Sequence, residues 1–592
     1  MTGIDYAIVG VFLLVMALAG LLISKLIKSP DDIFVAGRQL TPFVMAATIT
    51  ATNLSMYHFI SIGGIAYQKG ISIIWTNWTG NMALVFSGIF IIPLMRRLRV
   101  RSIPEFLEMR YSRGLRVLIG AFWGLRLCVF LGIFLYIATV TAMAITGLHN
   151  CWVWMAVFSL IAIMYSAIGG AWAVAIMDTV QFAFIIAGAL VTFPIAIHLA
   201  GGMPDLIHWL HSTGRTAHTQ IVPTTGEFGW LYLLAIMLIG FKWATVDQAI
   251  LQRAFGAQTP RMGAKGMVLS GLITTPLAFL WVLPGLAIAK LAAEHGLMFK
   301  NPDLAVPWFL SSQLPPIARG LLGFALFGLV AAQISTITAD INSVATLFTS
   351  DVYRKLKKIE PTQDQILKVA RISSLVCGAL MVLTAWVMLH TGDGAVRANL
   401  KIVGVVDLPF FVITIIFGLL WKRTTWQGAL AGFVGGSTVG ILAYLLVVPD
   451  YFHATLYPMF AAISGSLAAH VSSWHSVLKA YEPSMISIAP FVSTGTALVI
   501  TPLVSLVTKQ DNSETKGIWK HFQAGEEEKG EAFHLIPVSL VGRVGVALLV
   551  LGMLTFLFGV ISASRAFSLA PHLAVGGMIA VFAGGLLRVY SE

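Results

Sequence analysis

The sequence predicts an all-α polytopic membrane protein, and three observations support that prediction. Of its 592 residues, 57% are hydrophobic and only 11% are charged, whereas an average soluble domain has roughly 25% charged residues. The mean hydropathy is +0.85. Apolar runs of about 20 residues recur along the chain, and that length crosses ~30 Å of hydrocarbon as a helix. No stretch remains that could form a large soluble domain.

The number of spans expected from these runs is about 14–16. In chain order they are 5–27, 43–66, 73–95, 118–147, 152–168, 174–200, 228–249, 265–292, 318–349, 369–391, 401–421, 428–448, 453–472, 486–508, 541–562 and 567–588. No basic segment precedes the first apolar run and no cleavage site is evident, so residues 1–30 are expected to keep that run as an extra N-terminal transmembrane helix.

Basic residues concentrate on every second connection between spans. They are Arg96, Arg97, Arg99, Arg101, Arg110, Arg113 and Arg116, then Arg253, Arg261 and Lys265, then Arg354, Lys355, Lys357 and Lys358, and finally Lys422 and Arg423. Because cytoplasmic loops are rich in Lys and Arg, we expect a multi-pass cell membrane protein (inner or plasma membrane) with its N-terminus outside. Loops facing lipid also explain the net charge of +12 without a nucleic-acid partner, and no obligate protein partner is evident.

The second predicted span is expected to be broken. The segment TATNLSMYH places Asn53, Ser55 and His58 at mid-depth, and Gly63 and Gly64 follow. Non-helical backbone persists in a membrane only where protein buries it or where it lines a wet cavity. Transporters use such breaks, because unwound carbonyl groups coordinate cations there.

The ninth predicted span carries many hydroxyl groups. Ala332, Ser335 and Thr336 stand at i, i+3 and i+4 and therefore share one helical face. Two hydroxyls and a carbonyl, together with carbonyls of the broken span, would make an all-oxygen cage suited to sodium, a hard monovalent cation. The alternative is structural, since Ser and Thr in spans also bond back to their own helix or join helices together.

Six segments, taken together, are similar to the solute:sodium symporter family, to which the sodium/glucose cotransporters belong. They read FVAGRQLTPFVMAATITATNLS, RSIPEFLEMRYS, AIGGAWAVAIMDTVQF, DQAILQR, NSVATLFTSDVYRK and FGLLWKRTTWQGALAG. The resemblance covers about 30–440 and implies the LeuT-type fold, which contains two inverted five-helix repeats. These repeats would be 43–200 and 228–421, and 428–592 would add C-terminal transmembrane helices outside the resemblance.

The resemblance also implies where sodium binds. The family's sodium site matches the carbonyls of Ala51, Leu54 and Ala332 and the hydroxyls of Ser335 and Thr336. Members that bind a second sodium use residues that match Asp178, Ser335 and Thr338, but position 339, a serine in some of them, is alanine here. A carboxylate inside an apolar span is usually functional or paired, so the alternative for Asp178 is a hydrogen-bonding role near the cytoplasmic end.

Seven positions match the substrate contacts of the family: Asn53, Ser55, His58, Asn77, Lys242, Trp243 and Lys401. Sugar-transporting relatives have glutamine and glutamate where this chain has His58 and Asn77. Amide and imidazole groups still bind sugar hydroxyls, and Trp243 can stack on a sugar ring. The segment between Trp243 and the DQ pair is one residue longer here than in the sugar transporters of the family.

Several charged residues lie at or near membrane depth, namely Arg126, Lys242, Asp247, Asp340, Lys401 and Asp407. One interpretation is that Lys242 or Arg126 binds a substrate carboxylate. The other is that Lys242 pairs with Asp247 or Asp340 or extends to the interface, because buried charges need partners.

The predicted function is sodium-coupled symport of a small polar solute, a sugar or sugar derivative, with sodium as the only ion required. The first alternative is a sodium- or proton-coupled carrier of a carboxylate such as sialic acid, a uronate or a monocarboxylate, in which His58 could relay protons. The second is a membrane sensor with a transporter-like core, although no output domain follows. No enzyme is expected, since the scattered histidines form no catalytic or metal-binding pattern.

Overall fold

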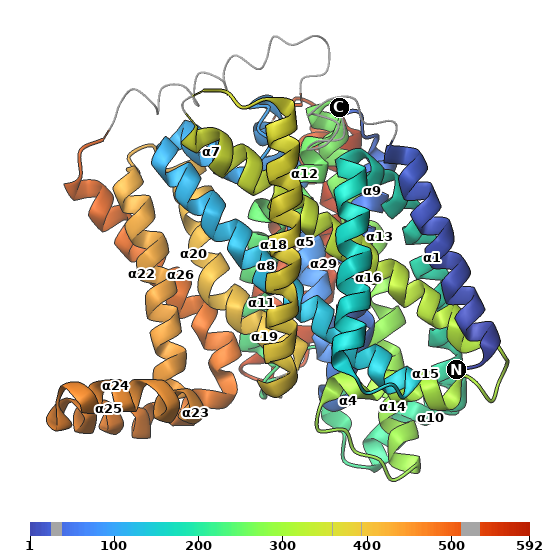
Figure 1. Ribbon diagram of the computed structural model, residues 1–592. Helices are drawn as coiled ribbons and strands as arrows, with labels where there is room; N and C mark the ends of the chain where they lie inside the picture. Colours follow the sequence, from blue (N-terminus) through green and yellow to red (C-terminus); the bar gives the residue numbers. More distant parts are fainter. Residues whose placement is uncertain (25–37, 358, 392–393, 511–532, 535, 592) are drawn as a thin grey trace.

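The computed structural model describes residues 1–24, 38–357, 359–391, 394–510, 533–534 and 536–591, and it confirms a helical membrane protein (Figure 1). These residues form no strand, and the β-type pairing among them is an isolated bridge between Leu40 and Ala257. Eleven of the described helices are long and apolar enough to cross a membrane, or up to twelve with one bent pair. The end of the predicted first span (25–27) and residues 511–532 lie outside the described residues.

The first half of the bundle follows the predicted spans. In chain order it contains α1 (Gly3–Ser24), α3 (Pro42–Asn53), η2 (Tyr57–Ile62), α4 (Gly63–Lys69), η3 (Ile71–Ile74), α5 (Trp75–Phe86), η4 (Ser87–Ile91), α6 (Ile92–Arg97), α7 (Ile103–Arg110), α8 (Arg113–Thr146), α9 (Cys151–Leu199) and α10 (Gly202–Ser212). Both predicted spans 152–168 and 174–200 fall on α9. The predicted break in the second span is confirmed, because α3 ends at Asn53 and η2 begins at Tyr57.

The second half repeats the pattern of a broken helix followed by long ones. It contains α11 (Trp230–Val246), α12 (Gln248–Phe255), α13 (Pro260–Leu277), α14 (Phe279–Glu294), α15 (Ala305–Gln313), α16 (Leu321–Thr346), η7 (Leu347–Tyr353), α17 (Arg354–Leu356), α18 (Gln363–Thr391), α19 (Ala395–Ile402), η8 (Val403–Asp407), α20 (Leu408–Phe411), η9 (Val412–Ile416) and α21 (Phe417–Leu420). The bent pair is α11 and α12, which meet at 42°. Asp247 stands at the bend, and its carboxylate accepts a hydrogen bond from the Ala249 amide at the start of α12 (3.2 Å).

The C-terminal region contains four long helices and one group that does not span. The helices are α22 (Trp426–Val447), α26 (Met485–Val507), α28 (Leu540–Ala563) and α29 (Ala570–Tyr590). The predicted span 453–472 is wrong, because α24 (Tyr457–Ile463) and α25 (Gly465–Leu478) lie across the axes of α22 and α26 (Figure 1). Ser464 adopts extended backbone between them, and helices of 7 and 14 residues are each too short for ~30 Å of hydrocarbon.

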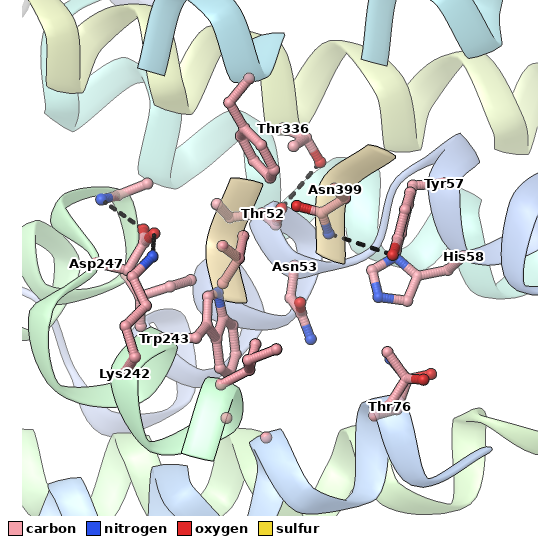
Figure 2. Close-up of a pocket in the computed structure, with 18 of the residues that line it drawn as sticks. Thr52, Asn53, Tyr57, His58, Thr76, Lys242, Trp243, Asp247, Thr336 and Asn399 are labelled. Carbon is pink, nitrogen blue, oxygen red and sulfur yellow. Dashed lines mark hydrogen bonds and ion pairs between the residues drawn. The ribbon is translucent and has the colours of Figure 1, made fainter. Parts of the chain in front are cut away.

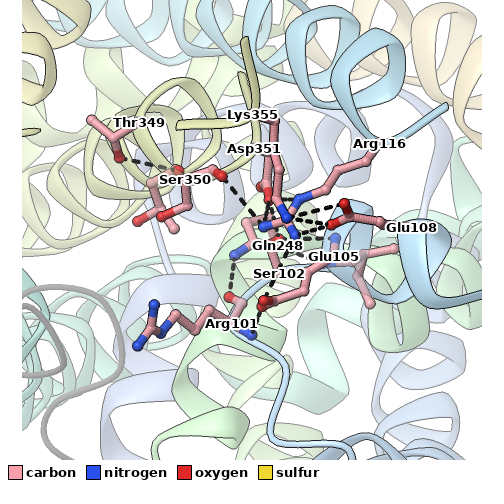
Figure 3. A network of polar contacts seen from close by, with 12 residues as sticks. Arg101, Ser102, Glu105, Glu108, Arg116, Gln248, Thr349, Ser350, Asp351 and Lys355 are labelled. Atoms are coloured by element: carbon pink, nitrogen blue, oxygen red, sulfur yellow. Dashed lines mark hydrogen bonds and ion pairs between the residues drawn. The ribbon is translucent and has the colours of Figure 1, made fainter. Parts of the chain in front are cut away.

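A polar network joins α7, α8 and η7 at the end of the bundle that carries the basic loops (Figure 3). The Arg116 guanidinium lies 2.6 Å from Asp351 and also pairs with Glu108, which in turn accepts from Lys355 (2.8 Å). Burial raises the pKa of the Glu108 carboxyl, but its hydrogen bonds from Lys355 and Arg116 outweigh burial and hold that pKa below its usual value. These ion pairs connect segments that are far apart in sequence, at the end of the bundle that carries the basic loops.

Small residues set the spacing between α28 and α29. A Cβ atom added at Gly577 would lie 2.6 Å from the carbonyl oxygen of Gly552, whereas one added at the adjacent Gly576 would meet no atom within 4 Å. Helices in membranes associate closely where small residues let their backbones approach. The contact at Gly577 therefore sets the distance between α28 and α29.

Gly577→Ala should destabilise the protein, because the two helices must separate to admit the methyl group. Overpacking of this kind costs about 1–3 kcal/mol. The measurement is the midpoint of thermal unfolding of the purified protein in detergent. Gly576→Ala is the matched control, and an equal midpoint for the two variants would contradict the described packing.

Candidate functional site

The break in α3 leaves backbone groups that other elements satisfy. Leu54 closes α3 by donating its amide to the Thr50 carbonyl (2.9 Å), and the chain turns extended there. The Met56 amide donates to the side-chain oxygen of Gln333 on α16 (3.3 Å). Gln333 is anchored in turn, since its own amide donates to the Phe134 carbonyl of α8 (2.7 Å). The break is therefore held open between α8 and α16.

The hydroxyl of Thr336 meets the freed carbonyls of the break. Its Oγ1 donates to the Thr52 carbonyl (2.8 Å) and lies 3.4 Å from the Leu54 carbonyl and 3.2 Å from the Ala332 carbonyl. These four oxygens come from two segments about 280 residues apart and carry no formal charge. Oxygen donors of this kind suit a hard cation, so this cluster fits sodium.

The structure brings three of the five predicted sodium ligands together. Leu54, Ala332 and Thr336 converge, and Thr52, which the sequence did not indicate, joins them. Ala51 lies buried in the last turn of α3. The Ser335 hydroxyl instead donates to Asp178 (2.6 Å).

Asp178 on α9 is the centre of a second polar cluster. Besides Ser335, its carboxylate accepts from Thr48 (2.7 Å) and Thr52 (3.2 Å), and the Arg253 guanidinium lies 3.2 Å away. Thr338, the third predicted ligand of a second sodium, bonds back to the Ile334 carbonyl of its own helix (2.8 Å). A cation of the protein thus already balances the charge of Asp178.

Arg253 corrects the sequence interpretation. The sequence predicts Arg253 in a basic cytoplasmic loop, but the structure places it on α12 with 7% of its surface exposed. Its Nε also donates to Thr48 (3.1 Å) and its Nη1 to the Ala249 carbonyl (2.6 Å). Because the helix bends at Asp247, α12 returns toward α3 and α16 and carries this arginine inward.

A cavity of about 140 Å³ opens beside the break (Figure 2). Five predicted substrate residues line it, namely Asn53, His58, Asn77, Lys242 and Trp243. The sequence indicated no role for Tyr57, Thr76 and Asn399, which also line the cavity, and Tyr57 and Asn399 hydrogen-bond to each other (3.2 Å). The Trp243 ring lies beside Gly80, and both residues line the cavity.

Two predicted substrate residues lie outside this cavity. Ser55 is fully buried at the break, and the Lys401 ammonium donates to the Tyr451 hydroxyl (3.0 Å). Lys401 belongs to helix α19 (Ala395–Ile402), and the face of that helix that lines the cavity carries Asn399 and Leu400 instead. The sequence does not reveal how a helix is rotated about its own axis, so it could not distinguish Lys401 from its two neighbours.

Neighbouring groups orient the imidazole and the amide that line the cavity. His58 Nδ1 accepts from the Ser55 amide (3.3 Å), and its ring packs edge-on against Trp281 with centroids 5.5 Å apart. The indole N–H of Trp281 donates to the Asn77 side-chain oxygen (3.1 Å). With one nitrogen and one oxygen engaged in this way, both side chains keep their remaining polar atoms for a ligand.

Charged residues form a buried cluster at one end of the cavity. Asp407 on η8 is fully buried and accepts from Arg126 of α8 (2.9 Å), and the Lys242 ammonium lies 2.5 Å from it. The Lys242 ammonium is also 3.5 Å from Asp247 and 5.0 Å above the ring of Trp123. The expectation that Lys242 needs a carboxylate partner is met by Asp247 and, unexpectedly, by Asp407.

A broken helix whose carbonyls meet a hydroxyl-bearing helix beside a polar cavity defines an ion-coupled transporter. The arrangement is similar to a solved substrate-bound, outward-open sodium-coupled sialic acid symporter, with a TM-score of 0.68 and 20% identity over 86% of this chain and 99% of that one, which shows the LeuT-type fold. The sequence model of the sodium:solute symporter family matches residues 33–436, which is more than half of the chain. The chain therefore belongs to that family.

Curated relatives agree with this family. The sodium/glucose cotransporter of Vibrio parahaemolyticus is 27% identical and matches over 73% of this chain and 83% of its own length. The sodium/sialic acid symporter of Proteus mirabilis is 25% identical, with 79% of this chain and 95% of the relative covered. The protein is thus a multi-pass transporter and not an enzyme, and it couples sodium to the symport of a solute.

Thr336→Ala should weaken sodium binding tenfold or more, because the variant loses the oxygen on which the carbonyls converge. Binding of radioactive sodium to the purified protein measures this directly. Thr384→Ala is the matched control, since the Thr384 hydroxyl bonds to the Leu380 carbonyl of its own helix (3.0 Å). A sodium affinity that Thr336→Ala leaves unchanged would remove the cluster as the ion site.

Asp407→Asn should destabilise the fold, because it leaves Arg126 and Lys242 buried without their shared carboxylate. Breaking a buried ion pair on one side costs about 3–5 kcal/mol. Adding Lys242→Met should recover part of this loss by removing one stranded cation. Thermal unfolding of the wild-type protein, the two single variants and the double variant tests the cluster, and additive losses in the double variant would argue against it.

Proposed function

We propose that the protein imports a sugar-like solute together with sodium, that the ion binds between the break in α3 and Thr336, and that the solute binds in the adjacent cavity. One observation carries this proposal, the hydrogen bond from Thr336 Oγ1 to the Thr52 carbonyl (2.8 Å). It joins the two halves of the bundle at a point where neutral oxygens gather. Sodium and solute would thus be neighbours, as coupling requires.

Coupling follows from the shared break. Sodium held by the carbonyls of Thr52, Leu54 and Ala332 and the hydroxyl of Thr336 would fix the position of Asn53 and His58, which line the cavity. The solute would therefore bind better to the sodium-loaded protein, and by linkage it would raise the sodium affinity by the same factor. Rocking of the predicted repeats 43–200 and 228–421 against each other would then expose both sites to the opposite side.

The proposed orientation places the N-terminus outside. The N-terminus lies at the opposite end of the bundle from α7 (Figure 1), and α7 stands among the basic connections that favour the cytoplasm. Import would then run down the sodium gradient and the membrane potential. Each sodium gains ~2.3 kcal/mol per 100 mV from the potential.

A carboxylate solute is the second candidate, because a relative from Proteus mirabilis is a sodium/sialic acid symporter. Arg126 and Lys242 would be its binding groups. Both are committed to Asp407 in this structure, so a carboxylate solute would have to displace that aspartate. A neutral or cationic sugar-like solute requires no such exchange.

Uptake into proteoliposomes tests the proposed function. An imposed inward sodium gradient should drive accumulation of D-glucose, D-glucosamine, N-acetyl-D-glucosamine or N-acetylneuraminic acid, and replacing sodium with choline at fixed pH should abolish it. Uptake that persists in choline would assign the drive to protons. Binding of both ion and solute without any gradient-driven accumulation would favour a sensor.

A further inference from the structure

The buried cluster beside the cavity carries an excess negative charge. It contains two cations, Arg126 and Lys242, and three carboxylates, Asp247, Asp340 and Asp407, and each of these residues is at most 8% exposed. Arg253 and Asp178, which lie next to it, balance each other. Buried charges require compensation, so one negative charge of the cluster lacks a cation.

Asp340 is the carboxylate without a partner. Asp407 takes both cations, and the two oxygens of Asp247 face the Ala249 amide and Lys242. Asp340 is 4% exposed and lines the cavity, and among the residues that the structure describes it makes no hydrogen bond or ion pair. Its electrostatic neighbours are Asp247, Arg253, Arg126 and Lys242, none within ion-pair distance of it.

The place of Asp340 suits a ligand of the cavity. It follows Thr336 by four residues on α16, so it lies one helical turn along the same face, and both residues line the cavity. The remaining walls supply an indole ring from Trp243 and neutral hydrogen-bonding groups from residues such as Asn53 and Asn77. The indole and amide groups of the walls are therefore complementary to a hydroxylated ring. The unpaired Asp340 carboxylate is complementary to one positive charge on that ring.

We propose that the transported solute is a sugar-like molecule bearing a protonated amino group, and that the Asp340 carboxylate binds this ammonium. The inference rests on the proposed function and specifies its substrate class. An ammonium group offers three donors and removes the excess charge of the cluster. Neutral analogues would leave the carboxylate buried and unpaired, a penalty that grows when the cavity closes and water leaves.

Competition and uptake assays with four solutes test this inference in proteoliposomes under an inward sodium gradient, at a pH where the amine is protonated. The probes are D-glucosamine, D-glucose, N-acetyl-D-glucosamine, which keeps the nitrogen without its charge, and N-acetylneuraminic acid, which is an anion. The wild-type protein should prefer D-glucosamine at least tenfold over each of the others. This panel decides the inference without any variant.

Asp340→Asn should abolish the preference, and D-glucose should then compete at least as well as D-glucosamine. The matched control is Asp364→Asn, an exposed aspartate in the first turn of α18, which should keep it. A variant that retains the preference, or a wild-type protein that favours D-glucose, N-acetylneuraminic acid or none of the four, would overturn the inference. Sodium-driven uptake of D-glucose with no amine preference would overturn the inference alone and leave the proposed symport standing.

Discussion

The site depends on a constraint of the membrane, which is that backbone groups released from a helix must find partners inside the protein. The break between Asn53 and Tyr57 releases such groups, and α16 supplies the partners. Thr336 bonds to the Thr52 carbonyl (2.8 Å), and Gln333 accepts from the Met56 amide (3.3 Å). A cation that binds the Thr52 carbonyl in place of the Thr336 hydrogen bond would change the energy of the break itself, and ion binding would thereby affect the neighbouring cavity.

A second constraint is the pairing of charge at membrane depth. Arg253 approaches Asp178, while Arg126 and Lys242 share Asp407. These pairs connect α12 with α9, and α8 and α11 with η8, so they link helices from both halves of the bundle. Arg126 and Lys242, which the sequence indicated as candidate ligands of a substrate carboxylate, are thus already paired with Asp407. The charges that stabilise the bundle therefore influence which solutes the cavity can accept.

Much of this arrangement was predictable from the sequence, because it follows from local chemistry. Polar residues in an apolar run indicated the broken helix, and hydroxyl spacing together with family resemblance indicated that Leu54 and Thr336 converge. What the sequence could not give depends on geometry beyond one helix. The bend between α11 and α12 turns Arg253 inward, the rotation of α19 about its own axis places Asn399 and Leu400 rather than Lys401 at the cavity, and a backbone break at Ser464 divides a segment that was apolar enough to span.

The central claim is that one sodium ion joins the break in α3 to α16. Hydrogen exchange of the backbone amides, measured in sodium chloride and in choline chloride at equal ionic strength, tests it most directly. The account predicts that sodium slows exchange in the segment around Leu54 and Met56, because the ion fixes the carbonyls next to these amides. Exchange that is equal in the two salts across this segment would contradict it.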